Sequence, residues 1–212
     1  HPSEWGKCLR YQQYKHYAQM GYVKVEPKEM SSKLLRLFDK GHNMHDRWSS
    51  YFDDIGNVLL GQWKCKNSLC RMFNDKGEIA TTNKDKLLNI LKENSPRIYK
   101  GKNNKPIFKP KKCVCGCEDF EYLETLVYRE DLKIKGHADL VLNFENININ
   151  KFKNVKVLFN KKYLPTGDDI IVGDMKTSGS NAWKSQVQSK GAHKAYLIQL
   201  VIYIHILDCK YG

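Results

Sequence analysis

The sequence predicts an α/β domain in which helices flank a central mixed β-sheet, with a cysteine-rich insertion in the middle of the chain. Two segments near the start, 3–20 and 31–52, place apolar side chains at three- and four-residue steps, as amphipathic helices do. The segments 120–144 and 169–176 alternate polar and apolar residues or run apolar, which is typical of strands. The apolar segment 193–209 predicts a buried C-terminal helix.

The helix that follows Ser31 carries one apolar stripe, and we expect this stripe to face the core. Asp53-Asp54-Ile55-Gly56 should end the helix. The stripe consists of Leu34, Phe38, Gly41, His45, Trp48 and Phe52.

The expected strands lie in the second half of the chain. Segments 120–128 and 136–144 are joined by the polar turn 129–131 and should form a hairpin. A further strand is expected at 155–159. The apolar run 169–176 ends abruptly in charged residues, which indicates a buried strand with a charged tip.

Composition favours a partner of negative charge. Lys and Arg number 36 against 23 Asp and Glu, a formal net charge of +13, and the simplest such partner is the phosphate backbone of DNA.

The seven cysteines are clustered and odd in number, and no signal-peptide pattern is present, which favours an intracellular, reducing compartment. The apolar run 196–207 is shorter than the roughly 20 residues that span a bilayer, so no membrane segment is expected.

We expect one nuclease-like domain in three parts. Residues 1–60 would form its N-terminal helical part, residues 61–120 a polar, lysine-rich insert, and residues 121–212 the core that carries the chemistry. Lysines are frequent in the second half of the insert and could follow a DNA backbone, although a solvated charged surface is the ordinary alternative.

The strongest functional signal is a pair of acidic strand tips, at Asp139 and at Asp174 with Lys176. Hydrolysis of a phosphodiester needs a divalent cation held by hard oxygen ligands, which two carboxylates supply. Lys176 lies two residues beyond Asp174, on the same face of an extended strand, where its ammonium could reach the attacking water or the phosphate. An isolated Asp-x-Lys triplet would more often be a weak surface ion pair.

Four spaced motifs in a fixed order, with a fifth near the N-terminus, give this triplet its context. Through them most of the chain resembles the RecB-like branch of the PD-(D/E)XK nucleases, which includes phage and mitochondrial exonucleases and CRISPR adaptation nucleases. The motifs are Cys8-x-Arg10-x-x-x-Tyr14, Gly41-x-x-x-His45, Gly136-x-x-Asp139, Asp174-x-Lys176 and Gln199-x-x-x-Tyr203.

The resemblance implies a restriction-endonuclease-like core and assigns roles to particular residues. His45, Asp139, Asp174 and the main-chain carbonyl of Met175 would bind the catalytic Mg²⁺ or Mn²⁺, and Lys176 would assist the nucleophile. His42 is a competitor of His45, but it lies off the apolar stripe of its helix.

Four further residues are implicated by the same resemblance. Gln199 and Tyr203, four apart on one helical face, would line the active site and position the DNA. The alternative is a core helix with two satisfied polar groups. Arg10 and Tyr14 would contact DNA, since a guanidinium suits a phosphate. Separately from the resemblance, His137 lies on the same side of its strand as Asp139 and could neighbour the metal, but the Gly-x-x-Asp motif selects Asp139.

The expected activity is Mg²⁺- or Mn²⁺-dependent hydrolysis of DNA, from an end as an exonuclease. Two alternatives stay open: a non-catalytic DNA-binding or recruitment protein on a nuclease scaffold, and a structure-specific endonuclease of the resolvase kind. The first alternative requires broken metal ligands, and the pattern above is intact.

Two short cysteine pairs separated by a long excursion resemble the knuckles of a zinc ribbon and predict a structural Zn²⁺ site. Cys65, Cys70, Cys113 and Cys115 are the expected ligands, with Cys117 as an alternative in the second pair. An iron-sulfur cluster that uses Cys8 and Cys209 is disfavoured, because such a cluster would lack two of its four ligands.

Overall fold

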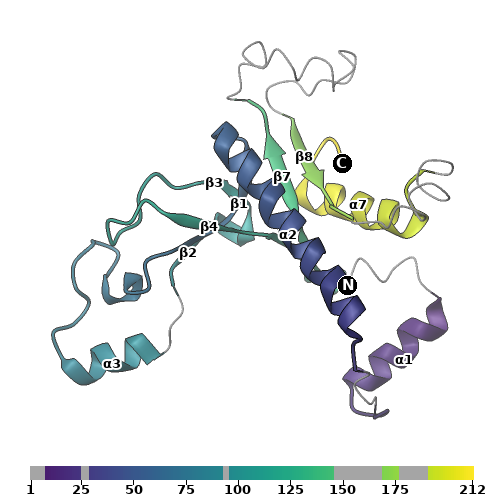
Figure 1. The fold of residues 1–212 in the computed structure, drawn as a ribbon, viewed down its shortest axis with the longest axis horizontal. Helices are drawn as coiled ribbons and strands as arrows, with labels where there is room; N and C mark the ends of the chain where they lie inside the picture. The colour runs from purple at the N-terminus through teal and green to yellow at the C-terminus, as the bar shows by residue number, and fades with distance from the viewer. Residues whose placement is uncertain (1–7, 25–28, 93–95, 146–168, 177–190) are drawn as a thin grey trace.

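The computed structural model describes residues 8–24, 29–92, 96–145, 169–176 and 191–212. The strand expected at 155–159 lies outside these residues. Two 3₁₀ turns, η2 (Cys70–Met72) and η3 (Lys102–Asn104), accompany the helices and strands, which are drawn in Figure 1. In chain order these are α1 (Leu9–Gln19), α2 (Ser32–Ile55), β1 (Leu59–Cys65), α3 (Lys84–Lys92), β2 (Ile98–Tyr99), β3 (Ile107–Phe108), β4 (Phe120–Leu123), β5 (Thr125–Arg129), β6 (Ile134–Ala138), β7 (Leu140–Asn143), β8 (Ile170–Gly173) and α7 (Lys194–Leu207).

The fold is mixed α/β around a six-stranded sheet whose hub is β1. The first residues of β1 pair with β3 and β7, and its last residues pair with β2 and β4. β7 in turn pairs with β8. All these strand pairs are antiparallel, and the one parallel contact in the described part of the chain is the bridge between Ile171 and Tyr211. The expected mixed sheet is therefore mostly antiparallel.

The expected boundary at residue 61 falls inside β1. Gly61 pairs with Ile107 of β3, and Cys65 at the other end of the strand pairs with Phe120 of β4. The strand is buried along almost its whole length, with Trp63 in its centre. A single strand thus joins the sheet that carries the acidic tips to the region that carries the cysteines.

The hairpin expected between 120 and 144 is present as β5 and β6, but it occupies only the middle of that segment. The first expected strand is divided at Glu124 into β4 and β5, and the second is divided at Asp139 into β6 and β7. β5 and β6 form a separate two-stranded sheet, while β4 and β7 join β1. The chain changes sheets at two acidic residues.

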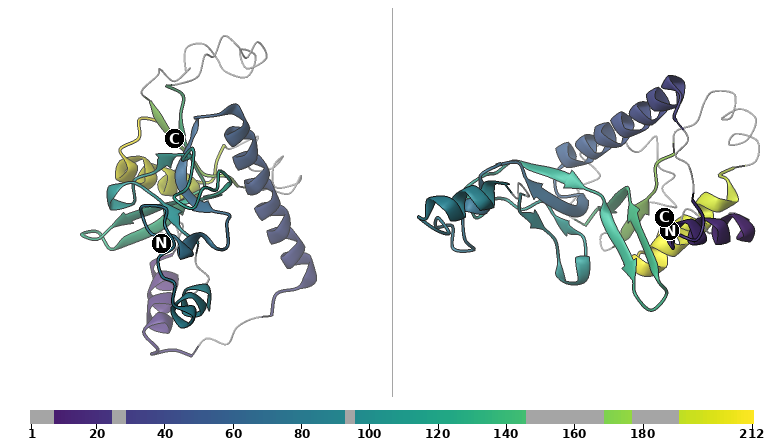
Figure 2. Two further views of the ribbon diagram at one scale, coloured as in Figure 1. Left: turned by 90° about the vertical axis from the view of Figure 1, so that its left-hand side faces the viewer. Right: turned by 90° about the horizontal axis from the view of Figure 1, so that it is seen from below.

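The apolar stripe of α2 faces the core only near its C-terminal end. The N-terminal turns of α2 project away from the sheet, as Figures 1 and 2 show, and Phe38 and Trp48 are exposed. Phe52 packs against the core cluster around Trp63. The expectation that the whole stripe is buried is wrong for Phe38, which lies on the projecting part of the helix, and for Trp48, which packs on Tyr51 and Phe52 of its own helix.

α7 is a helix as expected, but it is not buried as a whole. Gln199 and Tyr203 are its buried residues, whereas Val201 is 62% exposed. The helix contacts β5 and β8, so its polar pair faces the sheet. None of the helices in the described ranges is long and apolar enough to cross a membrane.

Candidate active site and metal centre

The residues Glu124 and Asp139 lie side by side at the open end of the β5–β6 hairpin. Thr125 and Ala138 are the last register pair of this hairpin and are fully buried, so the residue just beyond each is brought to the same end. His45 of α2 lies over this end. Its Nε2 is 3.8 Å from Asp139 Oδ2, and its Nδ1 is 3.8 Å from Glu124 Oε1.

One potential ligand atom from each of these three side chains lies within 4.8 Å of the other two. An imidazole and two carboxylates form a donor set that binds divalent cations. The chemistry of the residues present therefore fits a metal ion. The described part of the chain places Asp174 next to this group but not within it.

Asp139 is fixed from two sides. Its Oδ2 accepts a hydrogen bond of 2.6 Å from the main-chain N–H of Met175, and its main-chain carbonyl accepts one of 3.0 Å from the hydroxyl of Tyr122. Burial raises the pKa of Asp139, and the nearby charge of Asp174 acts in the same direction. A bound cation would stabilise the charged form of this buried carboxylate.

Asp174 and Lys176 form an ion pair at the end of β8. Lys176 Nζ lies 2.7 Å from Asp174 Oδ2, and Gln199 Nε2 donates to Asp174 Oδ1 at 3.0 Å. The side chain of Asp174 is 5% exposed, whereas that of Lys176 reaches the surface. Asp174 is thus held by one cation and one amide rather than left free.

Gln199 and Tyr203 of α7 lie beneath this pair. Gln199 Nε2 also donates to the Tyr203 hydroxyl at 3.0 Å, while its buried Oε1 has no partner among the described residues. Burial raises the pKa of Tyr203 to about 12, so its phenol stays protonated at neutral pH. The structure brings both residues to the acidic tips but leaves one polar atom unsatisfied, which differs from a core helix with fully satisfied groups.

A cavity of about 480 Å³ opens beside the His45 group. Its volume lies in the range of small-ligand pockets. Its walls come from α2, β1, the β4–β5 segment and the end of β6, and consist of His45, Asp46, Ser49, Gln62, Tyr122, Leu123, Glu124, Leu126, His137 and Asp139.

Other sequence-predicted residues have different outcomes. His137 lines the cavity, which agrees with its expected position beside Asp139. Arg10 and Tyr14 lie on α1, a helix without buried residues; both are exposed and neither lines the cavity. His42 is exposed on α2, whereas His45 is half-buried and faces the acidic residues. The choice of His45 over His42 thus agrees with the geometry.

Sequence reasoning missed Glu124 and Tyr122. Glu124 was hidden inside a segment expected to be one continuous strand, and the break in that strand is what turns it toward His45. Tyr122 belongs to the same segment, directly opposite Trp63 of β1, and packs on it edge to face. No turn residue in the segment 120–128 marks this break.

Gly61 makes room for the Tyr122 ring, because a Cβ at this position would overlap the ring. We expect Gly61→Ala to push Tyr122 away from Asp139 and to lower the free energy of unfolding by about 1–3 kcal/mol, as overpacked cores show. Gly173→Ala in β8 is the matched control, since its Cβ would lie 3.4 Å from Leu140, an ordinary contact. Chemical denaturation of both variants tests this, and equal stability of the two would contradict it.

The four expected zinc ligands converge at the far end of β1. Sγ atoms of Cys65 and Cys115 are 3.7 Å apart, and those of Cys70 and Cys113 are 3.3 Å apart. All four sulfurs lie within 4.8 Å of one another. Each pair joins one residue from the first knuckle to one from the second, so a bound ion would cross-link two distant segments of the chain.

The turn at 113–117 decides which cysteines face the centre. Cys113 N–H donates to the carbonyl of Cys117 at 2.8 Å, and Gly116 adopts a φ of 84°, a left-handed conformation that suits glycine. Cys117 Sγ points away and donates to the carbonyl of Asp119 at 3.4 Å. Cys113 and Cys115, rather than Cys117, therefore complete the group. Cys8 and Cys209 belong to no metal-binding group of the described residues.

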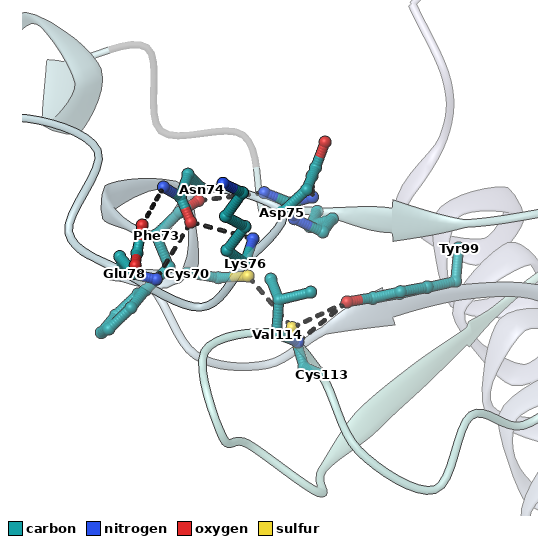
Figure 3. Close-up of polar contacts among 10 residues, drawn as sticks. Cys70, Phe73, Asn74, Asp75, Lys76, Glu78, Tyr99, Cys113 and Val114 are labelled. Atoms are coloured by element: carbon teal, nitrogen blue, oxygen red, sulfur yellow. Dashed lines mark hydrogen bonds and ion pairs between the residues drawn. The ribbon is translucent and has the colours of Figure 1, made fainter.

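The surroundings of Cys113 favour a thiolate. Burial opposes its ionisation, but hydrogen bonds lower the pKa of Cys113 to about 7, chiefly the one from the hydroxyl of Tyr99, 3.2 Å from Sγ (Figure 3), with further contributions from Cys115 and Cys70. Burial instead raises the pKa of Cys70 to about 11. A bound metal ion would offset the raised pKa of Cys70, because the ion favours the deprotonated form of its thiol ligands. The cluster could hold a metal such as zinc.

The loop after Cys70 is braced by a network of polar contacts shown in Figure 3. Asn74 Oδ1 accepts hydrogen bonds from the N–H groups of Lys76 and Glu78, which closes the turn. Arg97, just before β2, pairs with Asp75 and donates to the carbonyl of Phe73 at 3.0 Å. These Arg97 contacts link the loop after Cys70 to the start of β2, in addition to the link that the cysteine cluster makes.

Comparison with protein-family models, with curated proteins and with solved structures found no match for this chain.

Proposed function

We propose that this protein is a metal-dependent DNA nuclease of the RecB-like PD-(D/E)XK kind that hydrolyses phosphodiester bonds from DNA ends. The observation that carries the proposal is the hydrogen bond from the Met175 N–H to Asp139, which joins the His45 side of the site to the Asp174–Lys176 pair. A histidine, carboxylates and a lysine thus meet at neighbouring ends of β7 and β8.

In the proposed site His45 and Asp139 would hold Mg²⁺ or Mn²⁺, and Asp174 and the main-chain carbonyl of Met175, at the neighbouring tip of β8, would complete the ligand set. The ion would polarise the phosphoryl oxygen and make a bound water more acidic. Asp139 is the residue best prepared for this role, because burial has raised its pKa and a cation would relieve the cost of its charge.

We assign Lys176 the role of assisting the nucleophile. Its ammonium is held 2.7 Å from Asp174, while its side chain stays partly open to solvent. From there it can donate a hydrogen bond to the attacking water or to a phosphate oxygen. Gln199 keeps the opposite oxygen of Asp174 occupied, so the carboxylate is held in one orientation.

The excess of basic residues supports DNA as the substrate. The net charge of +13 would attract a phosphate backbone, and lysines of the 100–112 segment lie next to the second cysteine knuckle. We propose that zinc in the four-cysteine centre serves stability rather than hydrolysis, because four thiol ligands leave no open coordination position.

Lys176→Ala tests the proposed role of this lysine. We expect cleavage of end-labelled DNA in Mg²⁺ or Mn²⁺ to slow by about 100-fold or more, since positioned proton-transfer groups contribute 10²- to 10⁴-fold. DNA affinity, measured by fluorescence anisotropy, should change by less than about threefold, because one phosphate contact contributes little. Undiminished cleavage would contradict the mechanism.

Lys210→Ala is the matched control. Lys210, which follows α7, pairs at 2.9 Å with Asp169, the residue just before β8, so its removal also breaks a Lys–Asp ion pair at an end of this strand. This variant should cleave DNA at the wild-type rate. Equal loss in both variants would assign the effect to the fold of β8 and not to the chemistry.

A further inference from the structure

Glu124 is a candidate metal ligand that the motif pattern does not contain. The imidazole of His45 lies between two carboxylates, with Glu124 at 3.8 Å from one ring nitrogen and Asp139 at 3.8 Å from the other. These separations are too long for hydrogen bonds, yet the three groups converge. Oxygen and nitrogen ligands about 2 Å from one ion are spaced on this scale.

The backbone fixes Glu124 in this position. It is the one residue between β4 and β5, where the chain passes from the β1 sheet to the hairpin. Its two neighbours fix the backbone at this point: Leu123 pairs with Gln62 of β1, and Thr125 is fully buried. The Glu124 side chain itself is 46% exposed, so part of it is open to solvent beside the cavity.

A second, independent feature of the same cavity points to a bound group. Gln62 lines the cavity and is 9% exposed, and its Nε2 has no hydrogen-bond partner among the described residues. Buried donors without partners are uncommon in folded proteins. Water carried by a metal ion is an acceptor of the kind that this amide lacks.

We propose that Glu124 is an additional side-chain ligand of the metal ion, beside His45, Asp139 and Asp174, and that the His45–Glu124–Asp139 group selects Mn²⁺ over Mg²⁺. Imidazole nitrogen suits transition-metal ions, whereas Mg²⁺ prefers oxygen ligands alone, and the two carboxylates suit Mn²⁺. The inference rests on the proposed function in that Asp139 would serve both binding and hydrolysis, but metal binding can be measured without DNA.

The test is a titration of the zinc-loaded protein with Mn²⁺, followed by the electron paramagnetic resonance signal of the free ion. Glu124→Gln keeps the shape of the side chain and removes its charge, and we expect it to weaken Mn²⁺ binding by about tenfold or more. Glu124→Asp retains a carboxylate and should bind Mn²⁺ more tightly than Glu124→Gln. Mg²⁺ should displace Mn²⁺ from the wild-type protein only in large excess.

Glu121→Gln is the matched control, because Glu121 lies on β4 three residues away and pairs with Lys64 at 2.8 Å, outside the cavity. It should bind Mn²⁺ as the wild type does. Absence of Mn²⁺ binding to the wild type, wild-type affinity of Glu124→Gln, or equal losses in both variants would overturn the proposal. Circular dichroism of each variant checks that it is folded. Mn²⁺ binding that depends on Glu124, in a protein that leaves DNA intact, would contradict the nuclease function alone.

Discussion

Removal of the metal from the four-cysteine centre is expected to lower the melting temperature of the protein by about 10 °C or more. Structural zinc sites bind with apparent free energies of about 10–16 kcal/mol in small domains, and each kcal/mol shifts the melting temperature of a chain of this size by about 2–4 °C. Ligation of the ion by cysteines of the unfolded chain cancels part of this free energy, so the expected shift is smaller than the full binding free energy would give. Scanning calorimetry with and without a chelator measures it.

Cys113→Ser should reproduce this destabilisation, and Cys117→Ser should not. The two residues belong to one turn, but only Cys113 faces the other three sulfurs, while Cys117 donates to the carbonyl of Asp119. Elemental analysis should find about one zinc per chain in the wild type and in Cys117→Ser, as four thiolates bind one ion. Zinc retained by Cys113→Ser, or lost from Cys117→Ser, would contradict the assignment of ligands. Iron and sulfide in place of zinc would favour a cluster.

Loss of the metal from the four-cysteine centre should also slow DNA cleavage. The reason is that this centre and the proposed active site share the β1–β4 ladder. Cys65 ends β1 opposite Phe120, and two positions along the ladder Trp63 lies opposite Tyr122. Tyr122 then holds the main-chain carbonyl of Asp139. Loss of the metal would loosen the register that positions this carbonyl.

Asp139→Asn is expected to reduce DNA cleavage by about 1,000-fold. A metal ion contributes several kcal/mol of transition-state stabilisation, and each 1.36 kcal/mol is a factor of ten in rate. The substitution keeps the shape of the side chain and its contact with the Met175 N–H. Single-turnover kinetics at saturating Mn²⁺ measure the change.

The same variant should be more stable than the wild type when the catalytic metal is absent. Burial raises the folded-state pKa of Asp139 above its unfolded value, so the wild type loses stability as the pH rises from the unfolded to the folded pKa. An asparagine does not titrate, and this loss disappears. Denaturation curves taken from below the ordinary carboxyl pKa upward would show the difference in stability widening as the pH rises through the folded-state pKa of Asp139.

Asp131→Asn is the control for Asp139→Asn. Asp131 lies at the turn of the same hairpin, at the end opposite to Asp139, where Arg129 lowers its pKa to about 2. This exposed residue should have no effect on cleavage. A similar loss of activity in both variants would mean that hairpin charge, rather than metal binding, sets the rate.

The parts of the fold that the sequence predicts well are those with strong local signals. The charged tip after β8, the hairpin around the 129–131 turn and the C-terminal helix all have them. β1 was not predicted, although it is the hub of the sheet. Its sequence Leu-Leu-Gly-Gln-Trp-Lys-Cys lacks a two-residue alternation because both of its faces are covered.

Burial of the helices was predicted less well than their presence. An apolar stripe shows which face of α2 could pack, but not how far the sheet extends beneath it, and Phe38 lies beyond the covered part. In α7 the apolar residues surround the helix, so periodicity cannot choose a face. Gln199 and Tyr203 face inward in the structure. Gln199 donates to Asp174 there, and it also donates to the Tyr203 hydroxyl.

Some residues of the candidate site could be predicted from the sequence and others could not. The order of motifs pointed to His45, Asp139, Asp174 and Lys176, and the structure brings these residues together. Glu124 could not be found, since its role depends on a break between β4 and β5 that no turn residue announces. The choice between Cys115 and Cys117 likewise depends on the turn at Gly116.

The most direct test of the proposed function is the incubation of the zinc-loaded wild-type protein with linear end-labelled DNA and with covalently closed circular DNA, in Mn²⁺, in Mg²⁺ and in a chelator. We expect metal-dependent release of nucleotides from the linear DNA and an intact circle, as an exonuclease requires an end. Cleavage of the circle would favour a structure-specific endonuclease. DNA that is bound but left intact under every metal condition would contradict the proposal and favour a non-catalytic DNA-binding protein.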